Sequence, residues 1–267
     1  MINNNNAHSL NSLLLFLADK YETADFLVDD PSYFIHKVKG IENQEVLAFI
    51  ASCLSYGSRK QFFPKIQRIL DFSGGNVYLW VKSEAFKGYI PDNTACYYRL
   101  YTNHIMRHFL MALSLLLQKY STISHFLQVV LSYDGHKKID AFSCICAITE
   151  YFSEQGIETI IPKNTISSCK RICMFLRWMV REKSPVDLGI WSYFVDKKTL
   201  IIPLDTHVLQ EAMRLGLINN KNASMKSAKM LTLRMKEVFS EDPLKGDFAL
   251  FGLGIDTNNK YLVSCTI

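Results

Sequence analysis

Helical periodicity runs through nearly the whole chain and constrains its fold more than any other feature. Apolar residues recur at intervals of three and four, as in amphipathic helices, whereas the alternating pattern of strands is scarce. With 49% hydrophobic residues but only 12 Gly and 7 Pro among 267, the chain can bury a sizeable core and has no Gly- and Pro-rich linker. We therefore predict an all-α protein.

Short loop signals separate the predicted helices, for example FSGGN from Phe72 and SYDGHKK from Ser132. We expect helices over residues 9–21, 44–56, 60–72, 77–84, 102–118, 123–133, 141–155, 167–182, 188–193, 206–215, 224–240 and 243–253. Two helix ends carry specific signals, because Asp242 before Pro243 is a typical start and Gly216 is placed to end a helix.

Composition limits the cellular context. Seven cysteines, without a C-x-x-C pair or a four-cysteine cluster, predict reduced thiols in a cytoplasmic protein with no cofactor and no structural metal. The apolar run at residues 13–18 is too short for a membrane span and lacks the flanks of a signal peptide, so no membrane partner is expected. A net charge of +5 permits an anionic partner without requiring one.

A single carboxylate stands where the apolar stretch LIIPLDTHV meets an amphipathic segment. Asp205 can cap the following helix through the N–H groups of His207 or Val208, and the positive helix end favours its ionised form. The cap alone is a sufficient reason for an Asp at this position. The alternative is that the chain presents this carboxylate for chemistry.

A basic stripe on the segment SSCKRICMFLRWMVREK supports the second alternative. On a helix, Arg177 and Arg181 follow the line of Lys170, and Met174 and Trp178 border it. Most such stripes are solvated surfaces, but here no carboxylate intervenes before Glu182. Large apolar groups beside unpaired cations suit contacts with phosphates and bases, so nucleic acid is a plausible partner.

Histidine spacing offers one further possibility. His104 and His108 have the H-x-x-x-H spacing of a metal site on a helix, but the segment HIMRH lacks the Glu of the metalloprotease pattern. We favour a packed or exposed pair, and predict no metal.

The blocks CKRICMFLRWMVR, VDLGIW, IPLDTHV and DFALFGLG together resemble a bacterial family of mostly uncharacterised proteins. That family is similar to the helix-hairpin-helix DNA glycosylase superfamily, and closest in pattern to the archaeal 8-oxoguanine enzymes. The resemblance covers residues 161–255 and extends loosely to EVLAFIASCLSYGSR. It implies a two-lobed helical fold with a cleft between the lobes. Residues 1–45 and 185–267 would form the lobe with the catalytic Asp, and residues 46–184 the lobe that ends in the basic helix.

The resemblance also implies site residues. Asp205 matches the catalytic aspartate and Lys170 the nucleophilic lysine. The glycine hairpin that holds a DNA phosphate in many members is absent, so a helix N-terminus near Lys163, Asn164, Ser167 and Ser168 would replace it. The full set of expected DNA-binding residues is Lys163, Ser167, Ser168, Arg171, Arg177, Arg181 and Arg59. Tyr56, Trp178 and Asp247 are the candidates for a base pocket or wedge.

The implied activity is base excision from damaged double-stranded DNA, with an associated lyase step and oxidised guanine as the candidate lesion. A carboxylate stabilises the cationic sugar of such a reaction, and an amine can form a Schiff base with it. Burial and the cations Arg171 and Arg177 would lower the pKa of Lys170 from its ordinary value of about 10.4. We expect a monomer. The alternatives are a noncatalytic nucleic-acid-binding protein of the same fold and a helical structural protein whose basic stripe is merely solvated.

Overall fold

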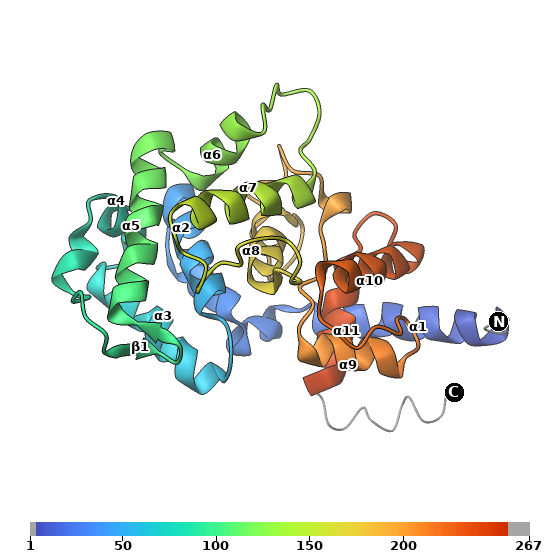
Figure 1. Ribbon diagram of the computed structural model, residues 1–267. Coiled ribbons are helices and arrows are strands. Elements are labelled where there is room, and N and C mark those ends of the chain that lie inside the picture. The colour runs from blue at the N-terminus through green and yellow to red at the C-terminus, as the bar shows by residue number, and fades with distance from the viewer. Residues whose placement is uncertain (1–3, 256–267) are drawn as a thin grey trace.

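The computed structural model describes residues 4–255, and these residues form an almost entirely helical structure (Figure 1). The prediction of an all-α protein is confirmed. The α-helices are α1 (Asn4–Tyr21), α2 (Ile41–Leu54), α3 (Arg59–Phe72), α4 (Val77–Lys82), α5 (Asn103–Tyr120), α6 (Ile123–Val130), α7 (Ala141–Glu154), α8 (Lys170–Val180), α9 (Thr206–Arg214), α10 (Met225–Val238) and α11 (Lys245–Ile255).

Shorter elements fill the connections. The 3-10 helices are η1 (Ala24–Asp29), η2 (Pro31–Lys37), η3 (Ala85–Gly88) and η4 (Lys197–Thr199). Two short antiparallel strands, β1 (Cys96–Tyr98) and β2 (Tyr101–Thr102), form a hairpin before α5. The sequence patterns predicted neither the hairpin nor η1 and η2, because segments of two to seven residues carry too little periodicity.

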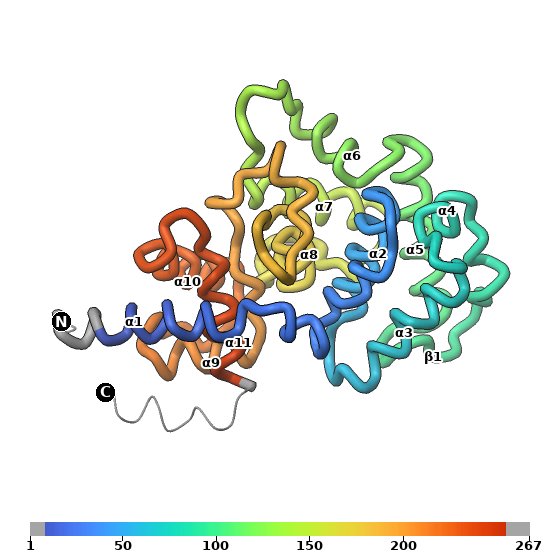
Figure 2. Tube along the Cα trace, turned by 180° about the vertical axis from the view of Figure 1, so that it is seen from behind, coloured from blue at the N-terminus to red at the C-terminus, as the bar shows by residue number. Residues whose placement is uncertain are grey.

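The helices form two groups that meet at α8. Helix α1 packs along α11, which also contacts α9, so helices from the two ends of the described residues lie together. Helix α2 packs against α8, η2 and α4, and α5 packs against α4 and α6. Figures 1 and 2 show α1, α9, α10 and α11 on one side of α8, and α3, α4, α5 and α6 on the other. The lobe boundaries at residues 45 and 184 remain a prediction.

Helix α8 is the centre of the core. Every side chain from Ile172 to Val180 is buried, including Arg177, so α8 has no solvated face over this length. Its C-terminal end is covered by residues 188–193, which form turns instead of the predicted helix. The N–H groups of Leu188 and Gly189 both donate to the carbonyl of Trp178, and that of Trp191 donates to Met179. These turns therefore satisfy carbonyl groups that the end of α8 leaves free.

Gly189 shows why this segment cannot be a helix. Its φ of +66° lies in the left-handed region, and a Cβ atom there would stand 2.6 Å from the Cα atom of Glu182. The backbone approach requires a residue without a side chain. The apolar spacing of LGIWSYF reflects burial of Trp191 and Phe194 in the core, not helical periodicity.

Glu45, a buried carboxylate, connects α2 to α6 and to the turn that carries Trp191. Glu45 of α2 is fully buried and accepts hydrogen bonds from the N–H groups of Ile123 (2.7 Å) and Ser124 (3.3 Å) and from the indole of Trp191 (2.7 Å). It therefore caps α6 from another helix. Burial raises the pKa of Glu45, and these hydrogen bonds act against that shift.

Candidate active site

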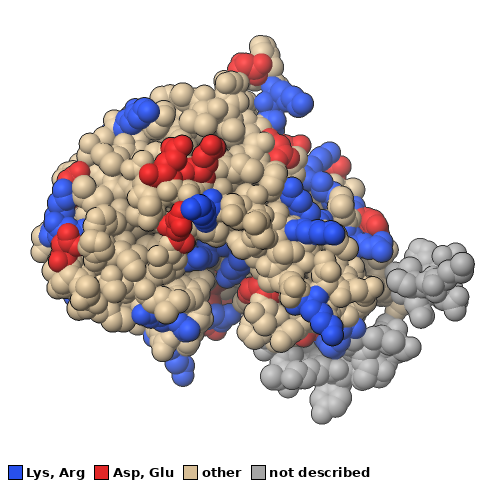
Figure 3. All heavy atoms as spheres, in the orientation of Figure 1, with Lys and Arg blue, Asp and Glu red and all other residues tan. Residues whose placement is uncertain are grey.

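A cavity of about 730 Å³ lies between the two groups of helices and contains both Lys170 and Asp205. In Figure 3 the surface is indented between the groups, with basic and acidic side chains next to each other. The walls come from η1 and η2, the α2–α3 connection, the β-hairpin, α8, the start of α9 and α11. The residues that line the cavity are Phe26, Asp30, Pro31, Ser55, Tyr56, Gly57, Ser58, Arg59, Phe62, Leu100, Tyr101, Thr159, Lys170, Arg171, Met174, Arg177, Pro203, Asp205, Thr206, His207, Val208, Asp247 and Phe251.

Lys170 is the first residue of α8 and is half-buried in this cavity. Within residues 4–255 its side chain makes neither a hydrogen bond nor an ion pair within 4.0 Å. Burial lowers the pKa of its ammonium group, while Asp205, Asp247 and Asp30 at longer range raise it and Arg177 lowers it further. The net shift is downward, which increases the fraction of neutral, nucleophilic amine.

Asp205 is held at the start of α9. Its Oδ1 accepts a hydrogen bond from the N–H of Val208 at 2.9 Å, so the predicted cap is confirmed. The helix ends as predicted, since Gly216 has a φ of +68° directly after the last turn. Because the same carboxylate lines the cavity, capping and a chemical role are compatible, and the cap fixes the direction of the side chain.

The segments that carry these two residues are joined by a hydrogen bond. The hydroxyl of Ser168 donates to the carbonyl of Leu204 at 3.0 Å, one residue before Asp205 and two before Lys170. Ser168 is buried, so the prediction that it contacts DNA is wrong. Its hydrogen bond instead fixes the segment that carries Lys170 relative to the segment that carries Asp205.

Two further carboxylates face the cavity. Asp247 of α11 is buried and accepts from Arg177 Nη1 at 2.6 Å. Burial raises its pKa to about 6, although Arg177 acts in the opposite direction. Asp30 is also buried and accepts from the N–H (2.9 Å) and the hydroxyl (2.6 Å) of Ser32. Sequence reasoning placed Asp247 beside the site but missed Asp30, which lies 140 residues before Lys170 and in no recognisable motif.

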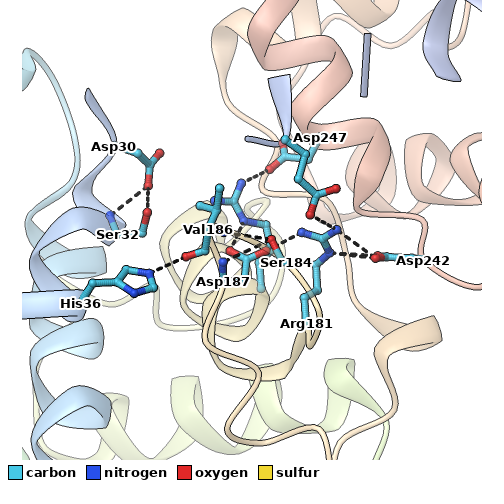
Figure 4. A network of polar contacts seen from close by, with 11 residues as sticks. Asp30, Ser32, His36, Arg181, Ser184, Val186, Asp187, Asp242 and Asp247 are labelled. Carbon is cyan, nitrogen blue, oxygen red and sulfur yellow. Dashed lines mark hydrogen bonds and ion pairs between the residues drawn. The ribbon is translucent and has the colours of Figure 1, made fainter. Parts of the chain in front are cut away.

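The predicted basic stripe does not face solvent. Arg177 and Arg181 are 4% and 1% exposed, so they do not form the predicted solvated surface, although Arg177 lines the cavity. Figure 4 shows Arg181 among acidic side chains of other segments. It donates to Asp242 at 2.9 Å, to Glu22 at 2.8 Å and to Asp187. Arg177 donates to Asp187 at 3.2 Å, in addition to Asp247.

The acidic partners explain why the pattern was misleading. Asp242 and Glu22 lie 61 and 159 residues from Arg181 in the chain, and Asp187 lies in the loop after the helix, so no carboxylate on the helix itself marked the stripe as paired. Both oxygens of Asp242 contact Arg181, and α11 begins at Lys245 instead of at the predicted Pro243. Burial raises the pKa of Asp187, and the two guanidinium groups oppose that rise.

Trp178 is also misplaced by the sequence prediction. Its side chain is fully buried beside the network and cannot serve as a base-stacking or wedge residue. The 3.6-residue geometry put it next to the arginines, but that side of the helix is buried as well.

The other residues predicted to contact DNA differ in their exposure and in the partners that they already have. Lys163 is exposed and pairs with Glu158 at 2.9 Å, and Ser167 is exposed. Arg59, the first residue of α3, lines the cavity and lies 3.9 Å from Asp29. Arg171 lines the cavity as well, but its guanidinium contacts the Tyr101 hydroxyl.

Tyr56 and the β-hairpin form one wall at the mouth of the cavity. The guanidinium groups of Arg99 and Arg171 lie 5.1 and 5.8 Å from the centre of the Tyr56 ring. The Tyr56 hydroxyl accepts from the N–H of Leu100 at 3.2 Å. Leu100 itself is 75% exposed and lines the cavity, a position that sequence reasoning missed because one Leu in a short turn has no periodic context.

These observations define a helical protein with a lysine and three carboxylates in one cleft. The chain belongs to the family described as "Protein of unknown function (DUF2400)", whose model matches residues 30–256 and so includes every cavity residue named above except Phe26. No curated protein and no solved structure matches the chain. Across the part of the chain that the structure describes, the helices are all too short or too polar to cross a membrane.

Proposed function

We propose that this protein is a base-excision DNA glycosylase with an associated lyase activity, and that damaged double-stranded DNA is its substrate. The observation that carries the proposal is the convergence of Lys170 and Asp205 on one cavity, although 35 positions separate them in the chain. A half-buried amine with a lowered pKa and a fixed carboxylate are the two groups that such a reaction needs.

The proposed reaction uses the amine as nucleophile. The lone pair of neutral Lys170 Nζ forms a bond to C1′ of the deoxyribose while the C1′–base bond breaks and its electron pair leaves with the base. The departing base takes a proton, which Asp247 can donate because burial raises its pKa to about 6. Asp205 stabilises the cationic sugar in the transition state.

The lyase step follows from the same covalent adduct. Nζ transfers one proton through Asp205 to O4′ as the C1′–O4′ bond opens, which leaves a protonated Schiff base between Nζ and C1′. Asp205, ionised again after that transfer, then accepts the proton from C2′, and the electron pair of the C2′–H bond expels the 3′ phosphate and breaks the strand. Each proton therefore has a donor and an acceptor within the cavity or the substrate.

The cavity also suits an extruded base. Phe26, Phe62, Met174 and Phe251 supply apolar surface around the charged groups. A volume of about 730 Å³ falls in the usual range of pockets for small organic groups. Oxidised guanine is the lesion that the sequence resemblance favours, and we propose it as the first substrate to test.

The β-hairpin lies where it could contact a duplex at the opening of the cavity. Leu100 is exposed beside the cavity and has Arg99 as its neighbour in sequence. Apolar side chains that enter a base stack and cations that meet the adjacent phosphates are the usual means of holding an opened duplex. We propose that Leu100 fills the space that the extruded nucleotide leaves, in place of Trp178.

The test is borohydride trapping of the Schiff base. The protein is incubated with duplexes that contain 8-oxoguanine, an abasic site or an undamaged base, and sodium borohydride reduces any adduct to a stable amine. We expect a covalent adduct with a damaged duplex, its loss in Lys170→Ala, and its retention in Lys119→Ala, which alters an exposed lysine of α5 that does not line the cavity. Binding without an adduct or base release would favour the noncatalytic alternative, and absence of binding at low salt would contradict both.

A further inference from the structure

A second group of chemically reactive side chains lies outside the cavity. Asp92, in the loop before β1, and His104 and His108, in the first two turns of α5, each offer one ligand atom within 4.8 Å of the others. None of the three lines the cavity, and all three are exposed. The H-x-x-x-H spacing alone favoured an ordinary histidine pair, but the contribution of Asp92 from another segment adds an independent observation.

Hydrogen bonds fix the protonation of both imidazoles. His104 Nδ1 lies 2.6 Å from Asp92 Oδ1, and His108 Nδ1 lies 2.9 Å from the carbonyl oxygen of His104. A carboxylate and a carbonyl only accept hydrogen bonds, so each Nδ1 carries the hydrogen. In the neutral rings the lone pairs are therefore on the two Nε2 atoms, which is the tautomer that a metal ion requires.

The two rings are close enough to act together. Their centroids are 4.0 Å apart, because residues four positions apart face the same side of a helix. The arrangement of a carboxylate behind one imidazole matches the way that outer carboxylates orient and polarise histidine ligands.

The loop that carries Asp92 is anchored to α5. The His104 N–H donates to the Asn93 carbonyl at 2.9 Å, and the Asn103 side chain donates to Asn93 Oδ1 at 2.9 Å. Arg107, the cation nearest on the same helix, donates to the carbonyl groups of Lys87 and Ile90 at 3.1 and 2.9 Å. Asp92 is therefore held beside His104 by the backbone, and the Arg107 guanidinium is engaged by the loop.

We propose that His104 and His108 bind a divalent transition-metal ion through their Nε2 atoms, with Asp92 as the outer carboxylate that orients His104. Two imidazoles favour ions of the Zn²⁺, Ni²⁺ and Cu²⁺ type, whereas Mg²⁺ and Ca²⁺ prefer oxygen ligands. Water would complete the coordination sphere at this exposed position. The site is independent of the proposed glycosylase activity, because no cavity residue takes part in it.

Calorimetric titration with ZnCl2 tests the site, using full-length protein without a histidine tag. We expect binding to wild-type protein, with at least tenfold weaker affinity in His104→Gln and in His108→Gln. Asp92→Asn should weaken binding by about tenfold, the lower end of the usual loss when an outer carboxylate is removed. His125→Gln, which alters another exposed histidine, is the matched control and should bind as wild type does.

The outcomes separate a chelating site from nonspecific binding. Unchanged Zn²⁺ affinity in either histidine variant or in Asp92→Asn, or an equal loss in His125→Gln, would overturn the proposal. MgCl2 should give no comparable heat. Thermal unfolding of each variant without metal shows whether it is folded, and added Zn²⁺ should raise the unfolding temperature of wild type but not of the double variant His104→Gln/His108→Gln.

Discussion

The environment of Lys170 combines two opposing influences on its charge. Burial lowers the pKa of the ammonium group, and the carboxylates Asp205, Asp247 and Asp30 raise it. The amine remains without a direct ion pair among the described residues, so part of the population can lose its proton without breaking a contact. Asp247 has the complementary shift, since burial raises its pKa to about 6. The two groups thus approach each other in proton affinity.

This pairing predicts a break in the pH profile of base release. Below pH 6, a rise in pH increases the neutral fraction of Lys170 while Asp247 stays protonated, so the rate should rise about tenfold per pH unit. Above about pH 6, loss of the Asp247 proton offsets the gain in amine, and the rate should level. Single-turnover measurements check the profile. In Asp247→Asn, which cannot ionise, the break should disappear whatever the absolute rate, and its persistence would exclude Asp247 as the donor.

Single residues also show how far the sequence alone can lead. Lys170 and Asp205 were selected because their motifs resemble those of the glycosylase superfamily, and both line the cavity. Arg177 and Arg181 carry the same local pattern as a DNA-binding stripe, yet their acidic partners come from the loop after the helix and from distant segments. Spacing on one helix determines which side chains share a face, whereas tertiary packing determines whether that face is solvated. Asp30 and Leu100 belong to no recognisable motif, so only the folded structure shows that they line the cavity.

Among the elements, the long helices follow their apolar periodicity, and the irregular ones do not. Residues 188–193 contain helix-like spacing but form turns, because Gly189 must approach the backbone of Glu182 and the free N–H groups complete the end of α8. The β-hairpin likewise depends on contacts with residues far away in the sequence, such as the hydrogen bond from the Leu100 N–H to the Tyr56 hydroxyl. Boundaries and short connections are decided by the neighbouring elements.

The hairpin leads to a prediction about DNA. Leu100→Ala should reduce the rate of base release from a lesion duplex by about tenfold, because nothing would then fill the space of the extruded nucleotide. Since Leu100 is 75% exposed, the free energy of unfolding should change by less than about 0.5 kcal/mol. Leu115→Ala, an exposed leucine on α5, is the matched control. An equal effect of both variants on the rate would rule out a specific role for the hairpin tip.

The contact between α2 and α6 predicts a pH-dependent stability effect. Glu45→Gln places a donor amide against the N–H groups of Ile123 and Ser124 and should lower the free energy of unfolding by about 1–3 kcal/mol. Because the pKa of Glu45 is raised in the folded state, the native protein binds more protons between the ordinary value of 4.5 and the raised value. The wild-type contribution of Glu45 therefore falls as pH rises through this window. Urea unfolding at several pH values should show the difference from Glu45→Gln shrinking toward neutral pH, and a widening difference would contradict the assignment.

At the scale of the whole molecule, the buried ionic network connects segments from both ends of the chain. Arg181 of the α8 C-terminus contacts Asp187 in the following loop and Asp242 before α11 (Figure 4). It also contacts Glu22, which directly follows α1. Arg177 joins the same network to Asp247, which lines the cavity. The network therefore lies next to the cavity. The position of Asp247, the proposed proton donor, depends on a chain of ion pairs that extends to Glu22 at the end of α1. Helix periodicity predicted the elements, but this assembly depends on charge pairs that only the fold brings together.

Removal of Arg181 should therefore destabilise the whole molecule. Arg181→Met leaves Asp187 and Asp242 buried with fewer positive partners, and we expect the free energy of unfolding to fall by about 3–5 kcal/mol, measured by urea denaturation. Arg234→Met removes an arginine that is 54% exposed and pairs with Glu237, so it should cost less than about 1 kcal/mol. The double variant Arg181→Met/Asp242→Asn should recover part of the loss, because one unpaired buried charge is removed with its partner. If the two single variants are equally stable, or if the second substitution adds to the loss, the network does not hold the two ends of the chain together as the contacts indicate.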